Sequence, residues 1–566
     1  MTALLTNNLP LLAGAPNGIK KLRELILELA VRGQLVTQQS EDLSAKSGLD
    51  ASRTARVKAM ADGKVKKEKP AVEVTNNEQP FRLPCGWVWC RIVDTGDYIN
   101  GLAFKPSDWS SIGRPIIRIQ NLSGRNSEFN RTEREVDSSV VVSPGDILVS
   151  WSATLDAFIW QGEQAVLNQH IFRVIPSSVM HDQYLYWLLK WAIKVLADSD
   201  HAHGLVMAHI NRGPFLAQPV GLPPLAEQHR IVAKVDELMA LCDRLEAQQA
   251  DAESAHAQLV QALLDSLTQA SDATDFAASW QRLAEHFHTL FTTEFSIDTL
   301  KQTLLQLAVM GKLAPQDPND EPANKLLGRI VSDRQQLANE GRFKKQKNLT
   351  EITEEEKLFA IPQNWEWARI SSFSELKSGL AYKSEAFSEV GKNQVIRMGN
   401  IRPGMLRLET NPAFISNDLA RDTFDFSLVA GDIVLTMTGT KGKQDYMYSV
   451  LIEEKHLEKS PLFLNQRLCA IRTQYINQKF LTLILQDQRL LDPIFRSSTG
   501  TANQANIGMS ALNNWALPIP PLAEQNRIVN AADQVMNICE AIKIKISTSY
   551  NVHNLISSAL IVEGLA

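Results

Sequence analysis

Two long segments repeat apolar residues at steps of three and four. After Pro224 the apolar positions are Ile231, Val235, Leu238, Cys242 and Leu245, followed by Leu259, Leu263 and Leu267. After Pro521 they are Ile528, Ala532, Val535, Cys539, Ile542 and Ile546. Such narrow stripes predict two long helices with a coiled-coil seam, on which both cysteines pack as core residues. The first helix, from Ala226 to Leu267, would be about 63 Å long.

The segments before each long helix have a strand-like pattern instead. Short apolar runs that follow turn signals predict buried strands at 115–119 and 146–151, and at 394–398 and 432–437. The run at 432–437 leads into the polar, Gly-rich loop Thr438–Gln444. The pattern therefore predicts a mixed α/β module before each helix, with loops on a rigid sheet as the carriers of recognition.

The chain also repeats itself. The helical stretch Leu22–Leu35 recurs as Leu300–Leu313. Gly101–Lys105 recurs as Gly379–Lys383, and Pro223–Val232 recurs as Pro520–Val529. Shorter matches pair 117–121 with 396–400, 145–148 with 431–434, and 167–169 with 464–466. A long-period repeat fixes the architecture before any motif is interpreted, and here it indicates one scaffold used twice with different loops.

We therefore predict an α+β protein with a pseudo-two-fold internal repeat, in which two similar α/β domains are separated by an antiparallel pair of long helices. The second long helix should then lie near the first helical region, bringing the chain ends close together. The expected regions are an N-terminal helix region (1–38), a charged linker (39–80), a first recognition domain (81–222), a central helical spacer (223–320), a second charged linker (321–360), a second recognition domain (361–518) and a C-terminal helical spacer (519–566).

Composition narrows the class of protein. The 566 residues are 44% hydrophobic and 21% charged, as in soluble globular proteins, and no run of 18 apolar residues predicts a membrane span. The five cysteines are scattered, which indicates a reducing, cytoplasmic location rather than disulfides or a zinc site. Acids outnumber bases over 225–270 but not over 361–518, so the net charge of −5 does not exclude a nucleic-acid partner.

With these features, the sequence resembles the specificity subunits of Type I restriction-modification systems. The resemblance rests on the doubled Pro-Pro-Leu-Ala-Glu-Gln-x-x-Ile-Val motif that opens each long helix, on the Leu-Ala-Val-x-Gly-x-Leu helices, and on the two divergent modules. It implies a non-catalytic subunit whose two target-recognition domains read a bipartite site on double-stranded DNA. It further implies that the helices dock two methyltransferase subunits, which restriction subunits then join. The sections 45–69 and 323–347 are longer than the minimal family pattern.

Loop residues of the types that read bases are the candidate DNA contacts. Arg and Lys suit guanine, Asn and Gln suit adenine, and Ser and Thr adapt to either. The candidates are Lys105, Ser107, Arg125, Asn126, Thr154, His203 and His209 in the first module, and Lys383, Arg402, Thr440, Lys441, Lys443, Gln444, Asn503 and Gln504 in the second. Arg118 and Asn121 match Arg397 and Asn400, so we expect these shared residues to hold the scaffold or phosphate.

No motif in the sequence indicates a catalytic site, a cofactor-binding site or a metal site. Asn411-Pro412-Ala413-Phe414 lacks the second proline of a methyltransferase tetrad, and Met437–Gln444 lacks the first Gly and the final Ser/Thr of a phosphate loop. Glu453–Lys455 has no Pro-Asp partner of a nuclease, and His201 and His203 have no third ligand nearby. A protein-binding scaffold and a lone methyltransferase or nuclease remain the alternatives.

Two further features of the sequence, the basic runs and the paired tryptophans, each allow more than one structural interpretation. The basic runs 64–69 and 342–347 are either phosphate contacts or solvated linkers. Trp87 and Trp89 match Trp365 and Trp367, and their alternation on a strand predicts that at least one of each pair lies in the core.

Overall fold

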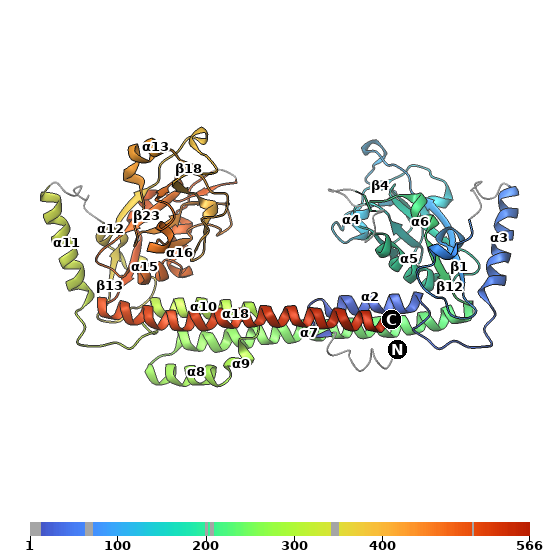
Figure 1. Ribbon diagram of the computed structural model, residues 1–566, viewed down its shortest axis with the longest axis horizontal. Helices are drawn as coiled ribbons and strands as arrows, with labels where there is room; N and C mark the ends of the chain where they lie inside the picture. Colours follow the sequence, from blue (N-terminus) through green and yellow to red (C-terminus); the bar gives the residue numbers. More distant parts are fainter. Residues whose placement is uncertain are drawn as a thin grey trace. The chain divides into compact units, whose positions relative to one another are not determined.

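The computed structural model describes residues 13–62, 72–197, 202–203, 209–340, 350–500 and 503–565, which form two compact units (Figure 1). Unit 1 comprises 1–253 and 549–566, and unit 2 comprises 254–548. Each unit therefore holds one α/β module together with helical segments from separate parts of the chain.

Unit 1 contains the first module. Its α-helices are α2 (Gly18–Val31), α3 (Ala45–Ala61), α4 (Ile119–Leu122), α5 (Asp182–Ala197), α6 (Arg212–Ala217) and the first part of α7 (Leu225–Gln269). Its 3-10 helices are η1 (Asn76–Glu78), η2 (Ile92–Asp94), η3 (Pro106–Asp108) and η4 (Ser138–Val140). Its strands are β1 (Val88–Arg91), β2 (Gly96–Asn100), β3 (Arg114–Ile117), β4 (Arg131–Thr132), β5 (Val141–Val142), β6 (Ile147–Ser150), β7 (Asp156–Ile159), β8 (Ala165–Leu167), β9 (Ile171–Pro176), β10 (Ala202–His203), β11 (His209–Ile210) and β12 (Pro219–Leu222).

The strands of the first module form two four-stranded sheets. One is antiparallel in the order β2-β9-β6-β7, and the other is mixed in the order β4-β3-β8-β5, with β3 and β8 parallel. The module's first strand β1 pairs with its last strand β12, with Val88 opposite Leu222. This pairing brings the two ends of the module together directly before α7.

Unit 2 repeats this plan. Its α-helices are α8 (Ala273–Glu285), α9 (Phe287–Leu290), α10 (Glu294–Val309), α11 (Ala323–Asn339), α12 (Ile370–Phe373), α13 (Asn417–Asp422), α14 (Glu454–Leu457), α15 (Gln478–Ile484), α16 (Gln488–Arg496), α17 (Met509–Asn513) and most of α18 (Leu522–Leu565). Its 3-10 helices are η5 (Glu354–Glu356), η6 (Ser384–Ala386), η7 (Met398–Asn400) and η8 (Phe424–Phe426).

The strands of unit 2 are β13 (Glu366–Arg369), β14 (Glu375–Ser378), β15 (Asn393–Ile396), β16 (Ile401–Arg402), β17 (Met405–Leu406), β18 (Phe414–Ile415), β19 (Ile433–Thr436), β20 (Thr438–Gly439), β21 (Ser449–Leu451), β22 (Leu462–Leu464), β23 (Leu468–Arg472), β24 (Ala505–Asn506) and β25 (Ala516–Ile519). The order β14-β23-β19-β21 corresponds to β2-β9-β6-β7, β15 and β22 are parallel like β3 and β8, and β13 pairs with β25. The prediction of two similar mixed α/β modules is confirmed.

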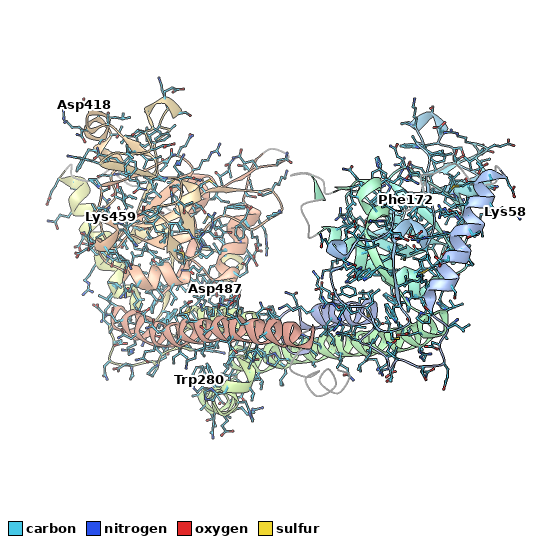
Figure 2. All side chains as sticks on the ribbon, turned by 45° about the vertical axis from the view of Figure 1, so that its right-hand side comes forward. Lys58, Phe172, Trp280, Asp418, Lys459 and Asp487 are labelled. Atoms are coloured by element: carbon cyan, nitrogen blue, oxygen red, sulfur yellow. The ribbon has the colours of Figure 1, made fainter. Side chains whose placement is uncertain are left out.

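Each module shares one hydrophobic core with the helices of its unit. In unit 1, Leu22 of α2 and Ile231 of α7 belong to the same buried cluster as Phe172 of β9, which Figure 2 labels within the first module. In unit 2, Ala308 of α10 and Ile528 of α18 join the corresponding cluster. Burial of this apolar area at about 25 cal/mol per Å² stabilises each module on its helices.

Each long helix has residues in both units. Helix α7 begins in unit 1 and ends in unit 2, whereas α18 begins in unit 2 and ends in unit 1. In unit 1 the end of α18 lies against α2, where the Lys21 Nζ donates to Asn554 Oδ1 at 2.9 Å. The expectation that the second long helix lies near the first helical region is confirmed. The first twelve residues and the last lie outside the described part of the chain.

The seam of α7 differs from the prediction at its second half. Leu259 is 53% exposed, whereas Val260 and Leu264 are fully buried, together with Leu267. One continuous helix with 3.6 residues per turn brings Val260 and Leu264 into phase with Ile231, so the stripe does not restart at Leu259. Cys242 and Cys539 are buried as predicted, and burial raises the pKa of both thiols.

In unit 2 the seam is built from three helices rather than two. Leu300, Leu304 and Leu307 of α10 share a cluster with α7 and α18. The side chains of α7 and α18 that join this cluster are Val260, Leu263, Leu264, Leu267, Val535, Cys539, Ile542 and Ile546. The antiparallel pair is therefore reinforced by the repeated short helix.

Helices also occupy part of the segments expected to be charged linkers. The side chain of Ser44 caps α3, and Arg53 of α3 forms two hydrogen bonds to Asp94, at 3.0 and 2.7 Å. In unit 2, Arg334 of α11 donates to the carbonyl oxygens of Ser371 and Ser374. These arginines attach each helix to the module of its own unit. The basic runs at 64–69 and 342–347 lie outside the described residues.

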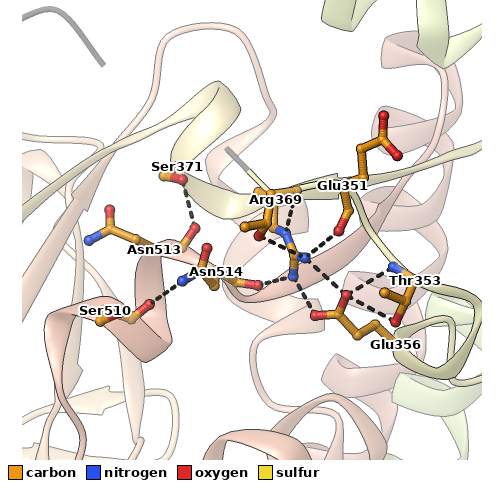
Figure 3. A network of polar contacts seen from close by, with 9 residues as sticks. Glu351, Thr353, Glu356, Arg369, Ser371, Ser510, Asn513 and Asn514 are labelled. Atoms are coloured by element: carbon orange, nitrogen blue, oxygen red, sulfur yellow. Dashed lines mark hydrogen bonds and ion pairs between the residues drawn. The ribbon is translucent and has the colours of Figure 1, made fainter. Parts of the chain in front are cut away.

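An arginine network holds the start of each module. The Arg369 guanidinium donates to both carboxylate oxygens of Glu356, at 2.6 and 2.9 Å, and to the carbonyl oxygens of Glu351 and Asn514 (Figure 3). In the first module Arg91 binds Glu78 through Nη2 alone, which donates to both carboxylate oxygens at 2.9 and 3.0 Å. Hydrogen bonding to Arg369 lowers the pKa of Glu356 to about 2.

Candidate nucleic-acid interface

A strained turn occupies the same place in both modules. It is formed by Asn168, Gln169 and His170 after β8, and by Asn465, Gln466 and Arg467 after β22. His170 and Arg467 both adopt a left-handed backbone, with φ of 73° and 69°. For a residue other than Gly or Asn this conformation costs of the order of 1–3 kcal/mol, so surrounding contacts must impose it.

Backbone hydrogen bonds from three segments impose the turn. Asn168 N donates to Ile117 O at 3.1 Å, and Gln169 N donates to Leu102 O at 2.8 Å. The carbonyl oxygen of His170 accepts from Trp151 N at 3.3 Å. Module 2 makes the equivalent bonds from Asn465 to Ile396, from Gln466 to Leu380 and from Met437 to Arg467, at 3.2, 2.7 and 2.8 Å.

One glycine in each module lies so close to the turn that no residue with a side chain fits in its place. A Cβ atom on Gly101 would lie 2.1 Å from the Asn168 carbonyl oxygen, and one on Gly379 would lie 1.9 Å from that of Asn465. This contact explains why the Gly-Leu-Ala-aromatic-Lys segment begins with glycine in both halves. The candidates Lys105, Ser107 and Lys383 lie a few residues after these glycines and are exposed.

The same backbone bonds bring two further loops to the turn. Ile210 N donates to Trp151 O at 2.9 Å, and Ile507 N donates to Met437 O at 2.9 Å. Candidate Thr154 lies in the loop after Trp151, and the backbones of candidates His203 and His209 are paired in the β10–β11 ladder. The turn, the loop after β6 or β19 and the β11 or β24 segment are therefore neighbours in each module.

Module 2 gathers most of its candidates here. β20 pairs with β24, with Gly439 opposite Ala505, so Thr440 and Gln504 continue the two sides of this ribbon. Thr440 donates to Asp445 through its backbone N and its hydroxyl, both at 2.7 Å, and these bonds lower the pKa of Asp445. Gln444 accepts from Gln488 Nε2 at 2.8 Å. The candidates exposed on this ribbon and its loop are Thr440, Lys441, Lys443, Gln444 and Asn503, and Asp445 is exposed beside them.

A polar cleft of about 480 Å³ lies beside the turn of module 2. Arg397, Asn400, Asn411 and the turn Asn465–Arg467 line it, and no acidic side chain is among its lining residues. The Arg397 guanidinium stacks on Phe387 at 5.7 Å and donates to the Asn411 carbonyl oxygen. In module 1 the Arg118 guanidinium stacks on Trp109 at 4.6 Å.

The shared asparagines hold the adjoining turn. Asn400 Oδ1 accepts from Arg397 N at 2.9 Å, while its Nδ2 donates to the carbonyl oxygens of Arg407 and Thr410. Asn121 bonds to Arg118 N, Asn126 O and Glu128 O in the same manner. This geometry supports a scaffolding role for both asparagines. It also fixes the loop that carries candidates Arg125 and Asn126.

Some candidates are not part of this ribbon. Arg402 lies on the β16–β17 hairpin, where its guanidinium donates to the Ile401 carbonyl oxygen at 2.8 Å. The side chains of His203 and His209 are not among the described ones. Gln466 and Arg467 were missed because their only sequence signal was the shared Leu-Asn-Gln island, which does not reveal a left-handed turn.

The sequence motifs that resemble catalytic or phosphate-binding motifs have local structural roles. Glu453 and Lys455 form an ion pair, which lowers the pKa of Glu453. Met437 is buried and carries the backbone bonds described above. No group of three or more His, Cys, Asp or Glu side chains is placed to hold a metal within the described part of the chain. Among the described helices, none is both long and apolar enough to span a membrane.

Comparisons with known proteins show which family the chain is similar to. Residues 84–253 and 362–548 match the family model of the Type I restriction modification DNA specificity domain. The chain is 35% identical over 561 residues to the EcoAI specificity subunit of a Type I restriction enzyme from Escherichia coli, covering 96% of this chain and 93% of that protein. It is 32% identical over 564 residues to the EcoEI specificity subunit from Escherichia coli, with the same coverage.

A solved structure shares the fold. It is described as the "structural basis underlying complex assembly and conformational transition of the type I R-M system". One of its chains matches with a TM-score of 0.52 and 15% identity, covering 86% of this chain and 99% of that chain.

Proposed function

Because this chain belongs to the family of Type I restriction-modification specificity subunits, we propose that each of its modules reads one half of a bipartite double-stranded DNA target. The chain itself carries no catalytic residue, and it brings two methyltransferase subunits, and through them restriction subunits, to that target. The complex acts in the cytoplasm.

One observation supports this proposal above the others. Two modules hold the same backbone turn with equivalent hydrogen bonds, yet carry different residues on the loops around it. A rigid, repeated frame with divergent loops suits reading two different short sequences. The candidate base contacts remain Lys105, Ser107, Arg125, Asn126, Thr154, His203 and His209 for one half-site, and Lys383, Arg402, Thr440, Lys441, Lys443, Gln444, Asn503 and Gln504 for the other.

The test is to map adenine methylation in a host that expresses this chain with its methyltransferase subunit, against the same host lacking only this chain. We expect a new motif of two short half-sites around an unspecified gap. Replacement of residues 81–222 by another module should change one half-site and leave the other unchanged. A protein-binding scaffold predicts no new motif in either experiment although the methyltransferase is bound and active.

The helices carry a second part of the proposal. Helix α7 has 45 residues and α18 has 44, so each is a rod of about 65 Å. If these rods set the gap between half-sites, deletion of one turn from both, about 5.4 Å each, changes the gap in the methylated motif. An unchanged gap with an intact complex would contradict this role of the helices.

A further inference from the structure

Arg467 and His170 occupy equivalent positions in two turns that are otherwise alike. The two residues before them are Asn-Gln in both modules. The backbone is left-handed in both, and the carbonyl oxygen of each accepts from the first residue after the central strand. The frame is therefore conserved between the halves while the side chain that it displays differs.

The Arg467 guanidinium is available for a ligand. Arg467 is exposed and lines the polar cleft beside Arg397. Within the described residues, its side chain has no hydrogen bond or ion pair to the protein. This distinguishes it from Arg397, which is half-buried and bonded to the Asn411 backbone.

The chemistry of this position favours a base over a phosphate. A guanidinium presents only donors, in a planar fork that matches guanine O6 and N7. Phosphates are the same at every base pair, so a phosphate contact would favour the same residue in both halves. His170, whose ring lies 4.7 Å from that of Trp151 in an edge-on arrangement, shows that this position does differ.

Resting on the proposed function, we infer that Arg467 is a specificity-determining residue that reads a guanine in the half-site of module 2, and that position 170 is its counterpart in module 1. The strained turn fixes the backbone of Arg467 relative to the ribbon that carries Lys441 and Lys443, because Met437 N donates to the Arg467 carbonyl oxygen. A guanidinium displayed from a fixed backbone position beside a basic loop combines base reading with attraction to the DNA backbone.

The test uses the full chain with its methyltransferase subunit and compares the methylated motifs of the wild type, Arg467→His and Arg467→Lys. Histidine suits this backbone because His170 already occupies it, so Arg467→His keeps the fold. We expect methylation of the original motif to fall about tenfold or more, with relaxed or altered preference at one guanine of one half-site. The other half-site should not change. The reciprocal variant His170→Arg should alter only that other half-site.

Arg421→Ala is the matched control, since Arg421 is an exposed arginine on α13 of the same unit, paired only with Asp418. It should leave the motif unchanged. Equal loss of binding to all sequences, with a salt dependence reduced by about one phosphate contact, would assign Arg467 to the backbone and overturn the inference. An unchanged motif in both Arg467 variants would also overturn it. A wild type that yields no split motif would instead contradict the proposed function itself.

Discussion

The indole Nε1 of Trp365 donates to Glu524 Oε2 at 3.0 Å, across 159 positions of the chain. Trp87 and Glu227 repeat this bond at 2.9 Å in unit 1. Both carboxylates belong to the Pro-Pro-Leu-Ala-Glu-Gln motif, so this motif joins the residue directly before the first strand of each module to the start of its long helix. Burial raises the pKa of both carboxyls, while the hydrogen bonds from the tryptophan and from Gln38 or Gln316 act in the opposite direction.

The next residue of the motif completes the connection. Gln228 Oε1 accepts from His181 N at 2.7 Å, and Gln525 Oε1 accepts from Asn477 N at 2.8 Å. Each glutamine also donates to the proline carbonyl before its helix. The repeated motif thus fixes the angle at which the chain enters each long helix.

Glu524→Gln should destabilise unit 2 by about 1–3 kcal/mol. The carboxylate accepts from both Trp365 and Gln316, whereas an amide offers only one acceptor and turns its NH₂ group toward the other donor. Thermal unfolding followed by circular dichroism measures the loss. Glu366→Gln, on an exposed position of β13, is the control and should change the stability little. Equal stability of the two variants would contradict the structural role of the motif.

Acid should weaken the Arg369–Glu356 network. Since the pKa of Glu356 is lowered from 4.5 to about 2, its ion pair stabilises the folded state above pH 4.5, and that contribution is lost as the pH falls toward 2. The stability difference between the wild type and Glu356→Gln should therefore shrink when the pH is lowered from neutral to about 3. Denaturant unfolding at both pH values measures it. Glu355→Gln, an exposed neighbour, should show a much smaller pH-dependent difference.

Two glycines should respond to alanine with opposite signs. Gly379→Ala should lower the free energy of unfolding by about 1–3 kcal/mol or more, because the added Cβ would overlap the Asn465 carbonyl oxygen and displace the turn Asn465–Arg467. Gly328 lies exposed within α11 with open space around it, so Gly328→Ala should stabilise the protein by about 0.5–1 kcal/mol. Unfolding midpoints of the two variants measure both effects. A harmless Gly379→Ala would show that the turn is not held as described.

Removal of two exposed lysines should change the salt dependence of DNA binding. If Lys441 and Lys443 contact phosphate, the variant Lys441→Ala/Lys443→Ala should bind more weakly and lower the slope of log K against log salt by about one for each lost contact. Titration of the assembled complex at several salt concentrations measures the slope. Lys459→Ala removes an exposed lysine of the same module that pairs with Glu409 and should leave the slope unchanged. A slope equal to that of the wild type would remove both lysines from the interface.

The sequence by itself determined the duplicated architecture. Apolar residues at helical spacing placed Ile231, Val235 and Cys242 on one buried face of α7, and the short apolar runs placed β3 and β6 and their counterparts β15 and β19. These features can be predicted from the sequence because a buried helix face or a short buried strand repeats apolar residues at a fixed local spacing. The repeat then assigned the same frame to both halves.

Only the tertiary structure decided what the loops present. Val260 replaced Leu259 on the seam because helix phase, set by packing on α10, outweighs a restarted pattern. Arg467 lies exposed on a left-handed turn because backbone hydrogen bonds from Ile396, Leu380 and Met437, distant in sequence, hold that turn. Such backbone hydrogen bonds leave no pattern in the sequence, because every residue has a backbone C=O and every residue except proline has a backbone N–H.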